Sequence, residues 1–333
     1  MKQLESTGIT RRRLLMGGLA SMSLASGLGE AYAQAFPAKS ISLVVAYAPG
    51  GSTDVVSRLL AQELSPALKQ SVVVENKAGG GTVIGTQFVQ KAPADGHTLL
   101  FGTNAFVITS QLTKPAPWDP LRDFEPVTLV TQQALGVLVR SGMNVNSISE
   151  LIAYAKANPG KVNFASSGSG SAQHLAGEAF RTAAGIEMLH IPYKGAGPAL
   201  QDLVGGQVDV MFTSLVGIAP YLATKKAVVI ATTGSKRNPA TPEIPTVAES
   251  GVPGLAGFEA ISWQAVFAPA KTPRAVIDRL HAEMVKIGKA GGLTKQLAEQ
   301  GMELRMGSAD ELRKVVAHER DNFIQVAKTV KFE

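Results

Sequence analysis

The 333-residue chain contains no cysteine. This excludes disulfide bonds, thiolate chemistry and a lipid anchor on an N-terminal cysteine. Charged residues make up only 17% of the chain and aromatic residues 6%, and after residue 35 the small excess of basic residues forms no run. A nucleic-acid groove needs clustered lysine and arginine with interleaved aromatic residues. We therefore expect no nucleic-acid partner.

Motifs of the common enzyme classes are also missing. Serines occupy positions 167 and 171, so Ser169 does not lie in a Gly-x-Ser-x-Gly motif. Nothing matches a P-loop, and residues 168–173 lack the third glycine of a dinucleotide-binding loop. The histidines show no metal-ligand spacing, and their positions are 97, 174, 190, 281 and 318. A dyad of Ser169 and His174 is disfavoured by their spacing across a loop–helix junction. We expect no enzyme, no metal and no cofactor.

The N-terminus carries an export signal. A twin-arginine pattern at residues 11–13 precedes a weakly apolar stretch, residues 14–28, that is too short to span a bilayer. Small residues then alternate, so residues 1–35 are predicted to be a signal peptide cleaved after Ala33 or Ala35. The mature chain would keep 28 basic and 24 acidic residues, a net charge of +4. We expect a free periplasmic monomer.

Two hydrophobic strands each run into a glycine- and serine-rich loop that opens a helix, at residues 41–54 and 162–174. The start of a helix has unpaired N–H groups and the positive end of the helix dipole, so such a corner can hold an anion. Two of these corners, about 120 residues apart, predict two lobes that grip one small anion. This favours binding over catalysis.

Strands alternate with helices along most of the chain, which predicts an α/β fold with largely parallel sheets. An amphipathic helix is expected over residues 53–68, and Ser147 with Glu150 predicts a capping box at the start of another. The pattern after residues 263–267 is purely helical. The expected strands of the first set are 41–46, 72–75, 98–101 and 127–131, and those of the second set are 136–140, 162–165, 189–192, 208–212 and 228–232.

The helical C-terminal region has no sheet of its own, so we assign it to the first lobe. The first lobe then comprises residues 36–132 and 262–333, and the second lobe comprises residues 133–261. The chain would cross between the lobes near 130–136 and near 258–264, which makes two hinge strands. The long proline- and glycine-rich stretch 238–257 is expected to be a surface connection.

Eight separated motifs, in the right order over the whole mature chain, resemble the tripartite tricarboxylate transporter substrate-binding proteins, also called TctC or Bug receptors. They are Tyr47-Ala-Pro-Gly-Gly-Ser-Thr-Asp54, Val73-Val-Glu-Asn-Lys-Ala-Gly-Gly-Gly81, Asp95-Gly-His-Thr-Leu-Leu100, Asp119-Pro120 with Asp123-Phe124, the loop leading to His174, Pro192-Tyr-Lys-Gly195, Gly206-Gln-Val-Asp-Val-Met-Phe212 and Pro245-Thr-Val-Ala-Glu-Ser-Gly251. The resemblance implies a two-lobed, periplasmic-binding-protein-like fold of type II, with two hinge strands, that closes over a carboxylate. It also implies delivery to a membrane permease of one large and one small subunit.

The resemblance implies carboxylate contacts from both loops, largely through backbone N–H groups and bridging waters. The implied ligand-binding residues are Tyr47, Gly51, Ser52, Thr53, Asp54, Asn104, Ser166, Ser167, Gly168, Ser169, Gly170, His174, Tyr193, Lys194 and Thr213. For several of these residues a purely structural role remains an alternative. Asp54 is more plausible as a loop organiser, since its charge would repel a carboxylate. For His174, a structural role at a helix start is the alternative to ligand binding. Trp263 is expected to pack near the hinge.

Departures from the family pattern bear on the ligand. Thr213-Ser214 stands where many members have an acidic residue, which disfavours an amino-acid ligand. Phe106 and Thr109 stand roughly where relatives carry histidine and asparagine, so the cleft should be more apolar beyond the carboxylate. We expect a mono- or dicarboxylate with a hydrocarbon or aromatic body. Two other functions stay open at this point: a sensor that presents its ligand to a membrane kinase, and an exported hydrolase.

Overall fold

The segment predicted to be a signal peptide lies outside the residues that the structure describes. The computed structural model describes residues 36–216, 218–223 and 225–326. From Lys39 onward these residues form one unit that contains two β-sheets. Within the described ranges, no helix combines the length and the apolar character needed to cross a membrane.

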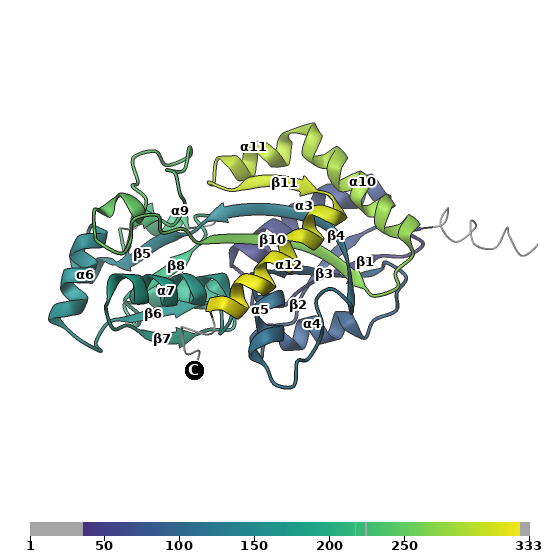
Figure 1. Ribbon diagram of the computed structural model, residues 1–333. Coiled ribbons are helices and arrows are strands. Elements are labelled where there is room, and N and C mark those ends of the chain that lie inside the picture. Colours follow the sequence, from purple (N-terminus) through teal and green to yellow (C-terminus); the bar gives the residue numbers. More distant parts are fainter. Residues whose placement is uncertain (1–35, 217, 224, 327–333) are drawn as a thin grey trace, which may run out of the picture. The chain divides into compact units, whose positions relative to one another are not determined.

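The first sheet has six strands: β1 (Ile41–Val45), β2 (Val72–Asn76), β3 (Thr98–Thr103), β4 (Phe124–Ala134), β10 (Ile261–Pro269) and β11 (Glu303–Gly307). Their order is β11-β4-β10-β3-β1-β2 (Figure 1). The helices that contact this sheet or each other on it are α3 (Ser52–Leu68), α4 (Val83–Gln90), α5 (Asn104–Leu112), α10 (Arg274–Ala290), α11 (Gly292–Ala298) and α12 (Ala309–Val326). We call this sheet with its helices lobe 1.

The second sheet has five strands: β5 (Gly136–Arg140), β6 (Asn163–Ser166), β7 (Leu189–Pro192), β8 (Val210–Thr213) and β9 (Ala227–Thr232). Their order is β7-β6-β8-β5-β9. The accompanying helices are α6 (Ile148–Ala157), α7 (Ala172–Ala184), α8 (Ala196–Val204) and α9 (Ala219–Ala223), with short 3-10 turns at η1 (Ser141–Met143) and η2 (Ala248–Ser250). We call this sheet with its helices lobe 2.

Both sheets are mixed, so the expectation of mostly parallel sheets is wrong in this respect. In lobe 1, β1 is parallel to β2 and β3, but β10 is antiparallel to β3 and β4, and β11 is antiparallel to β4. In lobe 2, β6 is parallel to β7 and β8, but β5 is antiparallel to β8 and β9. The antiparallel pairs involve the strands on which the chain passes from one sheet to the other, where no βαβ crossover sets a parallel direction.

The C-terminal region is not purely helical, which corrects a second expectation. Glu303–Gly307 forms strand β11 and pairs with β4 at the edge of the first sheet. Glu303 and Arg305 alternate with less polar residues and face solvent, because an edge strand is covered on one side only. This strand was not predicted because its charged residues stand at alternate positions, so it contains no apolar run.

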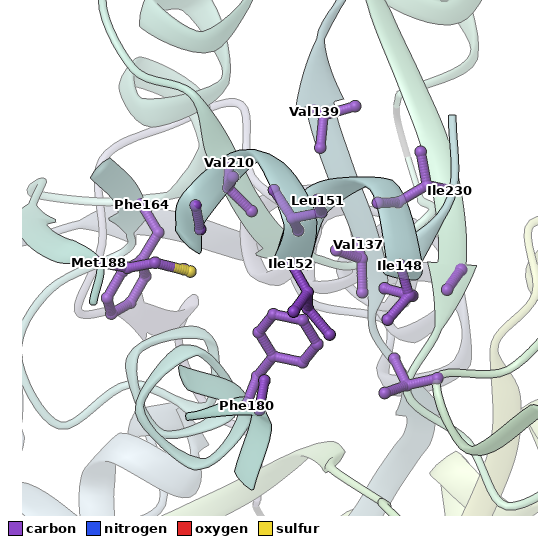
Figure 2. Packing of buried hydrophobic residues seen from close by; sticks show 14 of the residues in the cluster. Val137, Val139, Ile148, Leu151, Ile152, Phe164, Phe180, Met188, Val210 and Ile230 are labelled. Carbon is purple, nitrogen blue, oxygen red and sulfur yellow. The ribbon is translucent and has the colours of Figure 1, made fainter. Parts of the chain in front are cut away.

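The core of lobe 2 fixes the strands that carry one of the two predicted ligand loops. Helix α6 begins at Ser147, whose hydroxyl accepts the N–H of Glu150, while the Glu150 carboxylate accepts the N–H of Asn146. The cap that the sequence predicts is therefore present. The apolar side chains of this helix pack into a buried cluster with residues of the neighbouring strands and helices (Figure 2). The cluster includes Val137, Ile148, Leu151, Phe164, Phe180 and Val210. Phe164 anchors strand β6 in this cluster, and the strand ends two residues later at Ser166.

The two lobes are joined by long strands that pair with each other. β4 ends at Ala134 and β5 begins at Gly136, so the chain passes from one sheet to the other within one residue. β10 returns alongside β4 with Ser262 opposite Gln133. Trp263 of β10 is 2% exposed and its indole N–H donates to Glu319, so the predicted packing role of this residue is confirmed. We call the paired segments 132–134 and 261–264 the hinge ribbon.

Candidate ligand-binding site

The loop after β1 leads directly into helix α3. Gly51 is the N-cap of this helix and has no side chain to cap it. The N–H groups of Ser52 and Thr53 therefore have no partner within the helix, because the first residues of a helix lack acceptors. Tyr47 at the start of the loop is buried, and its hydroxyl lies 2.8 Å from the Thr103 hydroxyl. Burial raises the pKa of the Tyr47 phenol to about 12, despite the opposing hydrogen bond with Thr103.

Asp54 holds this loop in place. Its buried carboxylate accepts hydrogen bonds from the N–H of Gly50, from the Arg58 guanidinium and from the Asn76 amide. Burial acts to raise the pKa of Asp54, but the hydrogen bonds and the charge of Arg58 together outweigh it and keep the pKa below its usual value. An ionised, fully bonded carboxylate has no free donor to offer an anion, which fits the predicted organising role.

The second loop follows β6 and is held by its own side chains. The hydroxyl of Ser166 bonds the N–H of Gly168 at 3.1 Å, and the Gln173 amide oxygen accepts the N–H of Ser167 at 2.9 Å. Ser171 caps α7 by accepting the N–H of His174. Gly168 has a φ of +129°, a backbone conformation that other residues rarely adopt. A β-branched residue there would distort the loop.

Two stacked histidines lie beneath this loop. The rings of His174 and His190 are 3.9 Å apart and nearly parallel. Nδ1 of His174 accepts the N–H of Gly170 at 3.1 Å, and Nε2 of His190 lies 2.7 Å from the Ser166 hydroxyl. Burial, with a smaller contribution from the Arg181 charge, lowers the pKa of His174 to about 4. Burial and the neighbouring His174 lower the pKa of His190 to about 3.

Protein stability is expected to fall with acidification because of this pair. In the unfolded chain both histidines gain a proton near pH 6.5, whereas in the folded protein His174 resists protonation down to about pH 4. The stabilising contribution of His174 is thus complete above pH 6.5 and is lost progressively towards pH 4. Replacing His174 with asparagine should reduce the slope of unfolding free energy against pH in this window by roughly 1.4 kcal/mol per pH unit.

Urea unfolding of both proteins at a series of pH values measures the two slopes. His281→Asn serves as the control, since His281 lies on α10 in lobe 1, away from the ligand loops. Equal slopes for the wild type and His174→Asn would show that His174 is not held neutral by its surroundings.

The loop after β1 contacts lobe 2 at the segment between β7 and α8. The N–H of Ala48 donates to the carbonyl of Lys194 at 2.8 Å. A Cβ on Gly51 would lie 3.0 Å from the Ala196 Cβ, and a Cβ on Gly197 would lie 2.4 Å from the Pro49 carbonyl oxygen. These approaches leave no room for side chains on either glycine. The lobes are therefore closed on each other along this seam.

An inner cavity of about 30 Å³ lies between the loops and the hinge ribbon. None of the described residues that line it carries a charge. Its walls are hydroxyl and amide groups, two apolar side chains and the starts of helices α3 and α7. The lining residues are Tyr47, Ser52, Thr53, Thr103, Gln133, Leu135, Ser167, Ser171, Ala172, Gln173, Ser214, Ser262 and Gln264. Donors and helix N-termini without a formal charge can hold one small anion.

A second space, the rim chamber, adjoins the inner cavity at Tyr47 and Ser167 and measures about 170 Å³. Lobe 1 contributes Ala46 and residues 79–82, and lobe 2 contributes residues 167–169 and 192–194. Among the described residues of this lining, Lys194 alone is charged. The hydroxyl oxygen of Thr82 is buried and has no hydrogen-bond partner among the described residues.

The structure brings eight of the predicted residues to these two spaces. Tyr47, Ser52, Thr53 and Ser167 line the inner cavity, and Tyr47, Ser167, Gly168, Ser169, Tyr193 and Lys194 line the rim chamber. The other seven line neither space: Gly51, Asp54, Asn104, Ser166, Gly170, His174 and Thr213.

Several of these seven have partners that define a supporting position. The Asn104 amide oxygen accepts the N–H of Trp263, so it fixes α5 to the hinge strand β10. The Thr213 hydroxyl accepts from the Gln173 amide, which in turn accepts from Ser167. The N–H of Gly170 donates a hydrogen bond to Nδ1 of His174. These contacts shape the loops from behind.

The sequence reasoning missed the three glutamines of the inner cavity. Gln133 accepts the Ser214 hydroxyl at 2.6 Å, and the Gln264 amide lies 3.4 Å from the Ser52 hydroxyl. Gln133 and Gln264 are almost fully buried. A glutamine inside an otherwise apolar strand was the available signal, because buried amides need partners.

Known proteins resemble this chain in sequence and in structure. A family model described as "Tripartite tricarboxylate transporter family receptor" matches residues 56–331. Protein BugT of Bordetella pertussis is 35% identical over 298 residues, which cover 89% of this chain and 90% of BugT.

Two solved structures are similar over most of their length. The first, "R. palustris Rpa4515 with adipate", is 34% identical with a TM-score of 0.84 and covers 88% of this chain and 98% of that one. The second, "MatC (Rpa3494) from Rhodopseudomonas palustris with bound malate", is 30% identical with a TM-score of 0.82 and covers 87% and 99%. The predicted resemblance is confirmed: this chain belongs to the tripartite tricarboxylate transporter receptor family, together with the Bug receptors.

Proposed function

We propose that this protein captures a small carboxylate between its two lobes in the periplasm and delivers it to a two-subunit membrane permease. The observation that supports this most is the inner cavity, where both loops present uncharged donors to one point. Two relatives of similar fold hold adipate and malate. Binding, rather than turnover, is the activity we assign. The lobe boundaries at 132–133 and 261–262, the monomeric state and twin-arginine export remain part of this proposal.

The carboxylate is proposed to lie between the starts of α3 and α7. The N–H groups there, the hydroxyls of Ser52 and Thr53 and the amide of Gln173 are candidate donors. Hydrogen bonds to an ionised acceptor are about twice as strong as those between neutral groups. A set of neutral donors therefore discriminates a carboxylate from its amide without an arginine.

Lys194 is proposed to bind a second anionic group of the ligand. It lines the rim chamber, and its ammonium group makes no ion pair with any described residue. Lys194→Met should weaken binding of dicarboxylates by roughly ten-fold, the size of one charge-assisted hydrogen bond. Monocarboxylates of equal length should lose less than about two-fold.

Titration calorimetry of dicarboxylates and monocarboxylates of matched chain length gives the two ratios. Lys161→Met is the matched control, because Lys161 is an exposed lysine on the same lobe. Equal losses for both ligand classes, or a loss of the same size in the control, would contradict the role given to Lys194.

A thermal-shift screen of the mature protein against small carboxylates tests the proposed function. A ligand that binds only the folded state stabilises it by about 2.7 kcal/mol at 100 times its Kd. At least one carboxylate should raise the melting temperature in a saturable way. Steady consumption of the ligand, or no response to any carboxylate, would contradict the proposal.

A further inference from the structure

The hinge ribbon has two faces, and each face borders a different cavity. β4 and β10 run side by side and antiparallel (Figure 1), with Gln133 opposite Ser262 and Ala134 opposite Ile261. Successive side chains of a strand point to opposite faces. Ser262 borders the inner cavity, Ala134 and Ile261 border a separate pocket on the other face, and Gln133 contributes to the lining of both. We call this second space the hinge pocket.

The hinge pocket measures about 530 Å³ and takes its walls from both lobes. Residues 234–239 of lobe 2 form one wall, and residues 298–303 of lobe 1 form the other. The Asn238 amide donates to the carbonyl of Gly301 at 2.8 Å and links the two walls. The volume is typical of a small-molecule site. Any rotation of the lobes about the hinge ribbon must change the width of this pocket.

The pocket has a partly apolar floor and a charged rim. The hinge ribbon lines the floor with the apolar Ala134 and Ile261 and with the amides Gln132 and Gln133. Ile261 is 37% exposed, which is unusual for an isoleucine on a central strand. Arg237 is paired with Glu249. Lys236 and Glu259 also line the pocket, and neither forms an ion pair or a side-chain hydrogen bond with any residue of the described part of the chain.

Glu303 on the opposite wall is likewise already paired, with Arg305. One unpaired cation and one unpaired anion over a partly apolar floor complement a molecule with one carboxylate and one ammonium group joined by hydrocarbon. The inner cavity differs, because none of the described residues that line it is charged.

We propose that the hinge pocket is a second ligand site, for a small zwitterion whose ammonium and carboxylate groups are separated by a hydrocarbon chain, and that its occupancy favours lobe closure. The coupling rests on the proposed function. The two cavities lie on opposite faces of one ribbon, so a rotation that narrows the inner cavity widens the hinge pocket. In this structure the inner cavity is narrow and the hinge pocket is wide. A ligand in the pocket therefore stabilises the closed lobes and raises carboxylate affinity, and linkage makes the effect reciprocal.

The test uses 6-aminohexanoate as the probe, with hexanoate and hexylamine as controls that carry one charge each. Titration calorimetry of the mature protein should show saturable binding of the probe. Lys236→Met and Glu259→Gln should each weaken it about ten-fold, the size of one charge-assisted contact. Lys289→Met, at an exposed lysine on α10, should leave it unchanged. Hexanoate binding should not depend on Lys236 or Glu259.

Three results would overturn the proposal. The first is no saturable binding of 6-aminohexanoate up to about 100 mM, a concentration well above the range of weak ion-pair contacts. The second is probe binding that neither substitution affects, and the third is an equal effect of the substitutions on hexanoate binding. Saturating probe should also raise the affinity of a carboxylate found in the thermal-shift screen by about five-fold or more, and an unchanged affinity would refute the coupling. If no carboxylate binds but the probe still binds through Lys236 and Glu259, the proposed function fails while the second site stands.

Discussion

Replacing Gly197 with alanine is expected to weaken carboxylate binding by about 100-fold, because closure becomes sterically costly. A Cβ at this position would lie 2.4 Å from the Pro49 carbonyl oxygen, and the neighbouring Gly50 backbone is 3.3 Å away. Both contacts are to backbone of the opposite lobe, which cannot move without moving the lobe. The new methyl group must therefore hold the lobes apart along the seam between the loop after β1 and the start of α8.

The same substitution should not destabilise the protein. Gly197 lies in the first turn of α8, where alanine is the better helix former by up to about 1 kcal/mol. Binding and stability are thus expected to change in opposite directions, which a general folding defect cannot produce. Gly292→Ala is the matched control, since nothing lies within 4 Å of its Cβ. Calorimetry and urea unfolding measure the two quantities. Wild-type affinity in Gly197→Ala would show that closure along this seam is not needed.

The second large effect concerns the charge of the ligand. The primary amide of a bound acid is expected to bind at least about 100-fold more weakly than the acid, since the amide loses two charge-assisted hydrogen bonds. Within the described part of the chain no cationic side chain lines the inner cavity, so this discrimination depends on neutral donors and on the helix starts. Gly168→Val should likewise reduce binding more than Ser52→Ala, because it displaces backbone N–H groups rather than removing one hydroxyl.

Competition of acid and amide for the same site at constant ionic strength gives the ratio directly. Comparable affinities for the two compounds would refute carboxylate recognition by these loops. The reverse ranking of Gly168→Val and Ser52→Ala would instead place the main contact on the Ser52 side chain.

The sequence was most informative where local chemistry determines structure. The loop at 47–54 and the loop at 166–171 could be found because glycine, serine and threonine follow an apolar strand and open a helix, a pattern confined to a few residues. The capping box of Ser147 and Glu150 is local in the same way. The order of such motifs was enough to recognise the family.

Contacts that depend on distant segments could not be predicted in this way. Gln133 and Gln264 reach the inner cavity because β4 and β10 pair across more than a hundred residues of sequence. Strand β11 was missed because its alternating charges suit a sheet edge as well as a helix surface. The role of Gly197 depends on Pro49 in the other lobe. The residues behind the loops, such as His174, show how a family motif mixes lining positions with supporting ones.

Small-angle scattering during a titration tests the central claim most directly, because capture between two lobes requires that the ligand favour the closed arrangement. With a carboxylate found in the thermal-shift screen, the radius of gyration of the mature protein should fall and reach a plateau at one equivalent. Gly197→Ala should show no such fall. An unchanged scattering curve for the wild type, at a ligand concentration where calorimetry shows the site to be full, would contradict capture by lobe closure and indicate a rigid, preformed pocket.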